Sequence, residues 1–232
     1  MKPIYIVSWL FALAVSFVSC DDWLDKTPKD RLYPDVYFKT EDELRLFTNQ
    51  FYNNLVPSAV DIYSESSDLI VKSDLMLEMS GQRIIPDEGN GWNFTALRDI
   101  NFYLQYSHNC TEVNARNRYD GVARFFRAYF YFEKVKRYGD IPWYDKALDS
   151  DDPELYKARD SREFVMQKML EDLDFAIANL PKTKNAYVLT RWTALALKSR
   201  VCLFEGTFRK YHGLEDCEKY LNACVSASET FM

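Results

Sequence analysis

The stretch VNARNRYDGVARFFRAYFYFEKVKRYGDIPWY, residues 113–144, decides the fold class of this chain. Its apolar side chains recur every three or four residues, which is the spacing of one helix face. These apolar residues are Val122, Phe125, Phe126, Tyr129, Phe132 and Val135. The side opposite this stripe carries Arg116, Arg124, Arg127 and Lys134. The stretch therefore predicts an amphipathic helix over residues 113–138.

The end of this predicted helix is marked by Gly139 and Pro142. Glycine readily takes the left-handed conformation that ends helices, and a proline shortly afterwards prevents continuation. The extended exit directs Trp143 and Tyr144 back toward the preceding helix, so we expect both rings to pack rather than to stack on a ligand. Arg127 is expected to be solvent-facing or paired, not to hold a ligand.

Five further segments are predicted to be helical. Three of them begin at capping residues, which are Thr40 with its capping-box partner Glu43, Ser161 and Thr190. The same three are predicted to end at Pro57, Pro181 and Gly206. Helical spacing also resumes at Leu97, and a last helix covers about residues 215–228. Residues 58–91 lack this periodicity and are interpreted as mostly loop, with one short helix around 73–79.

The composition agrees with an all-α protein and excludes other classes. Hydrophobic residues are 47% and charged residues 28% of the chain, which predicts a packed core rather than a disordered tail. Only 7 Gly and 8 Pro are present, too few for an all-β sandwich, whereas 16 Tyr, 16 Phe and 5 Trp suit helices packed through aromatic faces. The net charge is −6 and no basic stripe is present, so nucleic acid is not an expected partner.

The first 20 residues have the layout of a bacterial lipoprotein signal. Lys2 precedes an apolar run over residues 4–18, which is shorter than the roughly 20 residues that a membrane-spanning helix needs. A small residue then precedes Cys20, where such a signal is cut and its cysteine acylated. We predict a signal peptide over 1–19, a lipidated tether over 20–40 and a membrane anchor at Cys20. An ordinary signal peptide is the alternative, but the bulky residues before the serine form a poor cleavage site for it.

The sequence contains no motif for metal binding or catalysis. It has two His and no pair of Cys at ligand spacing, so we predict no metal site, no cofactor and no catalytic residue. An acidic cluster resembles a calcium loop only loosely, because Pro153 interrupts it and the loop glycine is missing. It is interpreted as a solvated connector and consists of Asp149, Asp151, Asp152 and Glu154.

Four cysteines remain after Cys20, an even number that permits disulfides in an oxidising compartment. They are Cys110, Cys202, Cys217 and Cys224. The last two would lie on one helix face about 10 Å apart, too far to bridge each other. We expect buried thiols, while the disulfide state stays open.

Three segments together resemble the SusD/RagB family of outer-membrane nutrient-binding lipoproteins of Bacteroidetes. Residues 20–28, CDDWLDKTP, are similar to the lipoprotein start of that family. Residues 127–144, RAYFYFEKVKRYGDIPWY, are similar to its most recognisable helix and turn, and residues 189–206, LTRWTALALKSRVCLFEG, to a later helix. The similarity spans nearly all of the chain after the signal.

This resemblance implies an all-α fold of tetratricopeptide-like helical hairpins with long loops over residues 41–232. It implies a non-catalytic lipoprotein that faces outward from the cell outer membrane. Such a protein sits as a lid on a SusC-like TonB-dependent barrel and passes captured glycan or peptide to it. Family members are considerably longer, and their C-terminal half, which supplies part of the ligand surface, is not matched here. The chain therefore resembles an N-terminal portion, either a fragment or a truncated relic.

Sugar sites pair an aromatic ring with planar polar groups, and the predicted loop before Leu97 offers both. Trp92 and Asn93 lie beside a Gly-Asn-Gly turn, with Arg83 and Asp68 earlier in the same segment. The family resemblance implies ligand contacts from this region, so these four are the candidate ligand-binding residues. The alternative for Trp92 is packing against its neighbours, and the alternative for Asn93 is helix capping.

Two other classes of function remain to be weighed. A helical adaptor would bind another protein through a tetratricopeptide-like groove and should ignore oligosaccharides. A glycosidase would need two placed carboxylates, but the Asp and Glu residues are scattered and no nucleophile motif is present. We therefore expect a binding protein rather than an enzyme.

Overall fold

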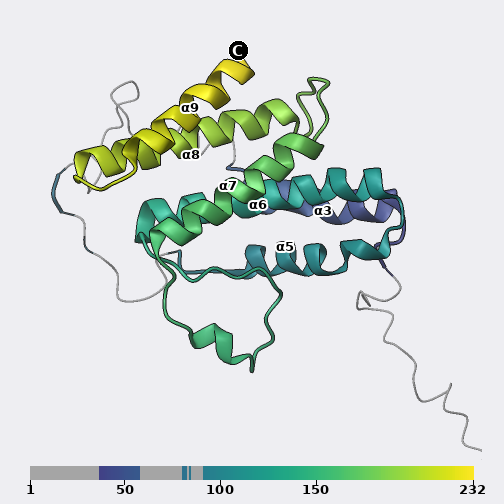
Figure 1. The fold of residues 1–232 in the computed structure, drawn as a ribbon. Helices are drawn as coiled ribbons and strands as arrows, with labels where there is room; N and C mark the ends of the chain where they lie inside the picture. Colours follow the sequence, from purple (N-terminus) through teal and green to yellow (C-terminus); the bar gives the residue numbers. More distant parts are fainter. Residues whose placement is uncertain (1–36, 58–79, 83, 85–90) are drawn as a thin grey trace, which may run out of the picture. The chain divides into compact units, whose positions relative to one another are not determined.

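Six α-helices make up most of the described chain, which comprises residues 37–57, 80–82, 84 and 91–232 of a computed structural model. In chain order they are α3 Glu41–Leu55, α5 Thr95–Tyr106, α6 Val113–Tyr138, α7 Arg162–Asn179, α8 Arg191–Tyr211 and α9 Cys217–Phe231 (Figure 1). Two 3-10 helices, η2 Ser107–Asn109 and η3 Pro153–Tyr156, lie in the connections. Within these ranges no strand occurs, and Ile141 and Asp160 form an isolated antiparallel bridge. The predicted all-α fold is confirmed.

Several of the sequence predictions lie outside the described residues. These are the signal peptide, the anchor at Cys20, the short helix around 73–79 and the candidate ligand residues Asp68 and Arg83. The helices described below belong to one unit that spans Phe38–Met232.

The long helix α6 is the element on which the others pack. It contacts α3, α5 and α7 and, less extensively, α8, which forms a second hairpin with α9 (Figure 1). Its buried side chains extend beyond the predicted apolar stripe to Arg127, Phe130 and Tyr131, whereas Tyr129 is only half-buried. The predicted apolar stripe is therefore buried apart from Tyr129, but the side opposite it is not uniformly exposed, because a helix contacted by four others buries residues on several sides.

Local sequence signals set most helix ends as predicted. Thr40 and Glu43 form the capping box of α3: the Glu43 N–H donates to Thr40 Oγ1 at 3.3 Å, and the Thr40 N–H donates to Glu43 Oε2 at 3.1 Å. Ser161 caps α7, because its Oγ accepts from the Phe164 N–H at 3.3 Å. Gly139 ends α6 with a φ of 71°, a conformation that favours glycine.

Gly206 does not end α8 as predicted, because the helix continues to Tyr211. A Cβ atom at Gly206 would lie 2.7 Å from Cδ2 and 3.1 Å from the backbone nitrogen of Leu221 in α9. The glycine therefore permits a close approach of two helices and does not terminate one.

Aromatic rings fill the space between α3, α5 and α6, as the composition predicts. Phe38 is fully buried before α3 and meets Phe47 edge-on, with 5.0 Å between ring centroids. It also meets Tyr103 of α5 at 5.5 Å. Phe51 of α3 contacts Phe126 of α6 at 6.0 Å. Such edge-to-face pairs stabilise the core beyond the burial of their surface.

The four described cysteines are free thiols. Cys110 and Cys202 are buried as expected, and burial raises the pKa of the Cys202 thiol to about 11. Cys217 and Cys224 are only half-buried, so the expectation of burial is wrong for these two. Both lie on α9, which packs mainly against α8, and only Tyr220 and Ala227 of this helix are buried.

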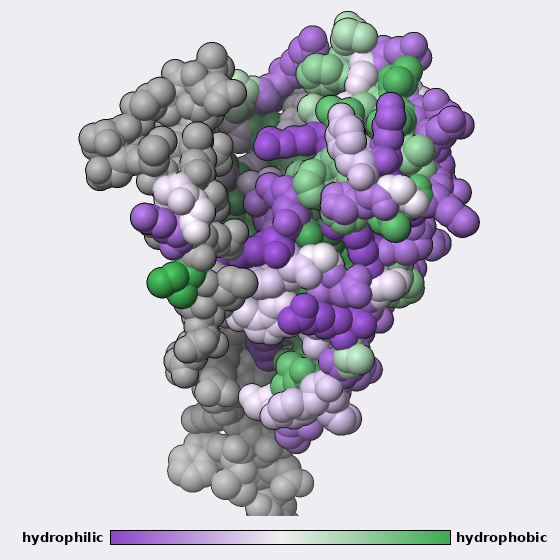
Figure 2. Space-filling view, turned by 90° about the vertical axis from the view of Figure 1, so that its left-hand side faces the viewer, coloured by the Kyte–Doolittle hydropathy of each residue, from purple (hydrophilic) through white to green (hydrophobic). Residues whose placement is uncertain are grey.

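The surface of the unit mixes polar and apolar residues. On the face shown in Figure 2, hydrophobic residues form separate patches between hydrophilic ones. Among the residues with described positions, no helix combines the length and the apolar character that crossing a bilayer requires.

Gly206→Ala is expected to lower the free energy of unfolding by about 1–3 kcal/mol, because the added methyl group overlaps Leu221 and the backbone of α9. Urea denaturation followed by circular dichroism measures the change. Gly121→Ala in α6 is the matched control: its Cβ would lie 3.4 Å from Leu180, an ordinary contact, and alanine favours a helix by about 1 kcal/mol. An unfolding free energy unchanged or raised by Gly206→Ala would contradict the close packing of α8 on α9.

Candidate functional site

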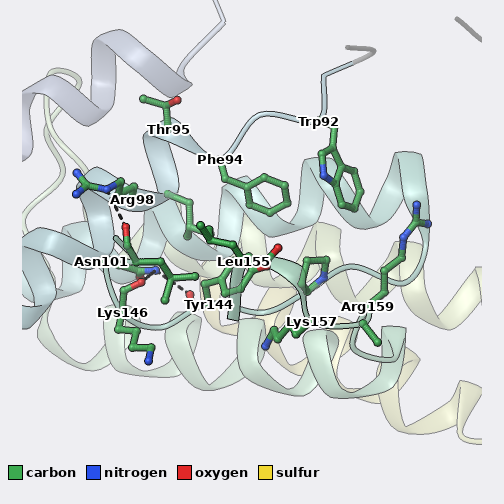
Figure 3. A pocket seen from close by; sticks show the side chains of 14 residues that line it. Trp92, Phe94, Thr95, Arg98, Asn101, Tyr144, Lys146, Leu155, Lys157 and Arg159 are labelled. Atoms are coloured by element: carbon green, nitrogen blue, oxygen red, sulfur yellow. Dashed lines mark hydrogen bonds between the residues drawn. The ribbon is translucent and has the colours of Figure 1, made fainter. Parts of the chain in front are cut away.

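A pocket of about 540 Å³ opens between the start of α5 and the connector of residues 139–160, which joins α6 to α7 (Figure 3). Its volume falls within the roughly 300–1,000 Å³ typical of small-molecule sites. Aromatic rings, aliphatic side chains, a buried amide and four basic side chains line it, and among its described lining residues there is no Asp or Glu. The pocket is therefore an apolar hollow with a basic rim.

The aromatic part of the pocket consists of Trp92, Phe94 and Tyr144. Phe94 meets Trp92 edge-on with 5.3 Å between ring centroids, and Tyr144 with 5.8 Å. Trp92 also contacts Tyr138 at the end of α6 at 4.9 Å, yet 41% of its surface remains exposed. Trp92 thus packs against its neighbours and also presents surface to the pocket. Rings fixed in this way suit stacking on the apolar face of a ligand.

The buried amide of Asn101 holds the connector against α5. Its Nδ2 donates to the carbonyl oxygens of Tyr144 at 2.8 Å and Lys146 at 3.3 Å (Figure 3). Its Oδ1 accepts from Arg127 Nη1 of α6 at 3.2 Å, which fixes the orientation of the amide. Arg127 in turn forms a bidentate ion pair with Asp172 of α7, at 2.6 and 2.8 Å. The wall of the pocket therefore depends on a buried charge pair between two helices.

Hydrogen bonds of Tyr131 and Asp160 hold the start of the connector in place against α6. The Tyr131 hydroxyl accepts from the Tyr144 N–H at 2.6 Å and donates to the Pro142 carbonyl at 3.3 Å. Burial raises the pKa of this hydroxyl, so it keeps the proton that it donates. The Tyr131 ring stacks on Trp143 with 4.2 Å between centroids, and Asp160 Oδ2 accepts from the Trp143 N–H at 2.7 Å. The predicted packing of Trp143 on the preceding helix is confirmed, whereas Tyr144 both packs there and lines the pocket.

The acidic cluster lies within the connector and pairs with the basic rim. Lys146 Nζ lies 2.8 Å from Glu154 and 3.6 Å from Asp152, and the hydrogen bond to Glu154 raises the pKa of the lysine. Asp152 also caps η3 by accepting from the Glu154 N–H at 2.9 Å. In the part of the chain that the structure describes, no group of three His, Cys, Asp or Glu side chains could hold a metal ion.

Of the four candidate ligand residues, Trp92 lines this pocket and Asn93 does not. Asn93 is exposed, and its Oδ1 accepts from the Thr95 N–H at 2.8 Å, although the N-cap position of α5 is occupied by Phe94 and not by Asn93. It lines a separate hollow beside Asp99. Asp68 and Arg83 lie outside the described residues. Ligand binding by these four stays a prediction.

The contribution of the connector to the pocket was not predicted from the sequence. Tyr144 was expected only to pack, and Lys157 and Arg159, which also line the pocket, carry no motif that singles them out. The available signal was the length of the segment 139–160 between two helices, since long loops in compact domains are often functional.

The sequence and the fold resemble those of known proteins. The profile of the SusD-like family, described as "Starch-binding associating with outer membrane", matches residues 50–191. SusD-like protein P38 of Formosa agariphila is 24% identical over 226 residues, which cover 88% of this chain and 43% of that protein. A crystal structure of a SusD-like protein from Bacteroides fragilis matches with a TM-score of 0.63 and 22% identity, covering 89% of this chain and 40% of that one.

A SusD-like carbohydrate binding protein from Bacteroides vulgatus matches with a TM-score of 0.57 and 14% identity, covering 83% of this chain and 44% of that chain. This chain therefore spans less than half the length of these relatives.

Arg127→Met is expected to lower the free energy of unfolding by about 3–5 kcal/mol, because it leaves the Asp172 carboxylate buried without its bidentate partner. The double variant Arg127→Met/Asp172→Leu should lose less, since no buried charge stays unpaired. Arg118→Met is the control: its exposed pair with Glu41, at 3.4 Å, contributes less than about 1 kcal/mol. Urea denaturation compares the three variants. A double variant as unstable as Arg127→Met would show that the ion pair is not what Arg127 contributes.

Proposed function

Because this chain belongs to the SusD-like family, whose description is starch-binding and associated with the outer membrane, we propose that it is a surface-exposed lipoprotein that binds oligosaccharides. It delivers them to a SusC-like TonB-dependent transporter of the outer membrane. The pocket between α5 and the connector is the proposed binding site (Figure 3). Binding is non-covalent, and the protein acts as a carrier rather than as an enzyme.

The observation that carries this proposal is the aromatic lining of the pocket. Trp92, Phe94 and Tyr144 present rings on which the C–H face of a pyranose can stack. Thr95 at the start of α5 lines the same pocket and offers a hydroxyl group to sugar hydroxyls. Asn101 does not serve the ligand, because both ends of its amide are already hydrogen-bonded inside the protein. The B. vulgatus relative named as a carbohydrate binding protein supports this assignment.

The proposed membrane attachment rests on the N-terminal sequence. Cleavage after residue 19 leaves Cys20 as the acylated first residue, and residues 20–40 then act as the tether. Each buried methylene of an acyl chain contributes about 0.8 kcal/mol, so two or more chains hold a protein at a bilayer where one chain is marginal. The helical unit then faces outward, where it can meet oligosaccharides and the transporter.

A protein adaptor is the second candidate function, and exposed apolar side chains favour it. Six of them lie on or beside the last two helices, namely Leu203, Tyr211, Leu214, Val225, Phe231 and Met232. Scattered exposed apolar residues are common on soluble proteins, so this observation is weaker than the aromatic pocket. An adaptor would bind a protein segment and no oligosaccharide.

Trp92→Ala is expected to weaken oligosaccharide binding about tenfold, because it removes the most exposed ring of the pocket. Isothermal titration of the full-length protein with a panel of oligosaccharides measures the dissociation constants. Tyr211→Ala is the control, since this exposed ring at the end of α8 lies outside the pocket. Unchanged affinity in Trp92→Ala would move the binding site elsewhere, and a protein that binds none of the panel would favour the adaptor.

A further inference from the structure

The pocket lining is basic although the chain is acidic. The net charge of the chain is −6, yet the described residues that line the pocket include four basic side chains and no carboxylate. A neutral oligosaccharide does not need such a lining. A basic side chain that has no carboxylate partner in the protein is free to bind an anionic group of a ligand, so we compare the partners of the four cations.

Three of the four cations are tied to carboxylates of the connector. The pairs, with their nitrogen to oxygen distances, are Arg98–Asp149 (3.7 Å), Lys146–Glu154 (2.8 Å) and Lys157–Asp160 (3.0 Å). Lys157 Nζ also donates to the Trp143 carbonyl oxygen at 2.6 Å. Each of these three side chains therefore already has a carboxylate partner in the connector.

Arg159 differs from these three cations. Within the described ranges, no carboxylate forms an ion pair with it, and the neighbouring Asp160 is taken by Lys157 and the Trp143 N–H. Its Cζ lies 4.9 Å from the centroid of the Trp92 ring, and the side chain is exposed. Figure 3 shows it rising from the connector toward Trp92 at one end of the pocket. The guanidinium group is thus held beside the most exposed ring, with its donors available to a ligand.

We infer that the pocket selects an oligosaccharide that carries a carboxylate or a sulfate group, with the anionic group on Arg159 and the sugar ring against Trp92. This inference rests on the proposed function, because it names the class of oligosaccharide for the same site. A planar guanidinium donates two parallel hydrogen bonds to a carboxylate or sulfate, and such charge-assisted bonds are about twice as strong as neutral ones. The cation–π contact with Trp92 holds the guanidinium in place before the ligand arrives.

The same geometry disfavours a neutral ligand in this position. A neutral sugar stacked on Trp92 would remove water from part of the Arg159 guanidinium without supplying a negative charge. An anionic sugar replaces that water with two charge-assisted hydrogen bonds. The preference for charge should therefore arise from Arg159 rather than from the three cations already paired with the connector.

Matched pairs of ligands test this inference on the full-length protein. Titration compares a galacturonate tetrasaccharide with its methyl ester, and a sulfated galactan tetrasaccharide with its desulfated form. The expected result is that the charged member of at least one pair binds about tenfold more tightly than its neutral partner. The pair that shows the effect identifies the anionic group. Near 1 M salt, where the screening length falls to about 3 Å, the ratio should shrink.

Variants locate the charge preference. Arg159→Ala should reduce the ratio of the two dissociation constants from about ten to about one, while Arg159→Lys should retain part of it because a lysine keeps the charge without the planar fork. Arg200→Ala removes an exposed arginine of α8 that does not line the pocket and should keep the full ratio.

Two results would overturn the inference and leave the proposed function standing: equal binding of both members in both pairs, or a charge preference that survives in Arg159→Ala. If no oligosaccharide binds at all, charged or neutral, the proposed function fails together with the inference.

Discussion

The buried ion pair between Arg127 of α6 and Asp172 of α7 is the interaction on which the rest of the structure depends. Its two hydrogen bonds, at 2.6 and 2.8 Å, join α6 to α7, and a third hydrogen bond from Arg127 reaches Asn101 on α5. Charges removed from water are stabilised only when their geometry is good and their remaining donors are satisfied. The pair therefore fixes how three helices meet and leaves little freedom for other arrangements.

The pocket follows from that constraint. Asn101 can donate to the carbonyl oxygens of Tyr144 and Lys146 only while Arg127 holds its oxygen on the other side. Tyr131 of α6 also holds the connector, because its hydroxyl accepts a hydrogen bond from the Tyr144 N–H and its ring stacks on Trp143. A binding surface held in this way loses little conformational freedom when a ligand arrives, which favours affinity. Core packing and ligand recognition thus share the same buried polar network.

The helices could be predicted from the sequence because the signals that start, end and orient them are local. Capping residues such as Thr40 and Ser161 act within one helical turn, and apolar spacing reports burial along the same segment. The prediction that α8 ends at Gly206 was wrong, because this glycine is required by its close contact with Leu221 on the next helix. Trp92 was predicted to contribute to a ligand site, and it lines the pocket in the structure. The opposite wall of the pocket is formed by the connector, whose sequence has no helical periodicity and no binding motif.

The sequence by itself determined the all-α class, most helix boundaries, the net acidity and the family resemblance, because each depends on composition or on residues close together in the chain. Only the tertiary structure decided that Arg127 is buried rather than on a basic face, and that Arg159 stands beside Trp92. A helical period records that a residue is buried or exposed, not which distant segment covers it. Partners far apart in sequence are chosen when the helices pack together, and the pocket exists only at that level.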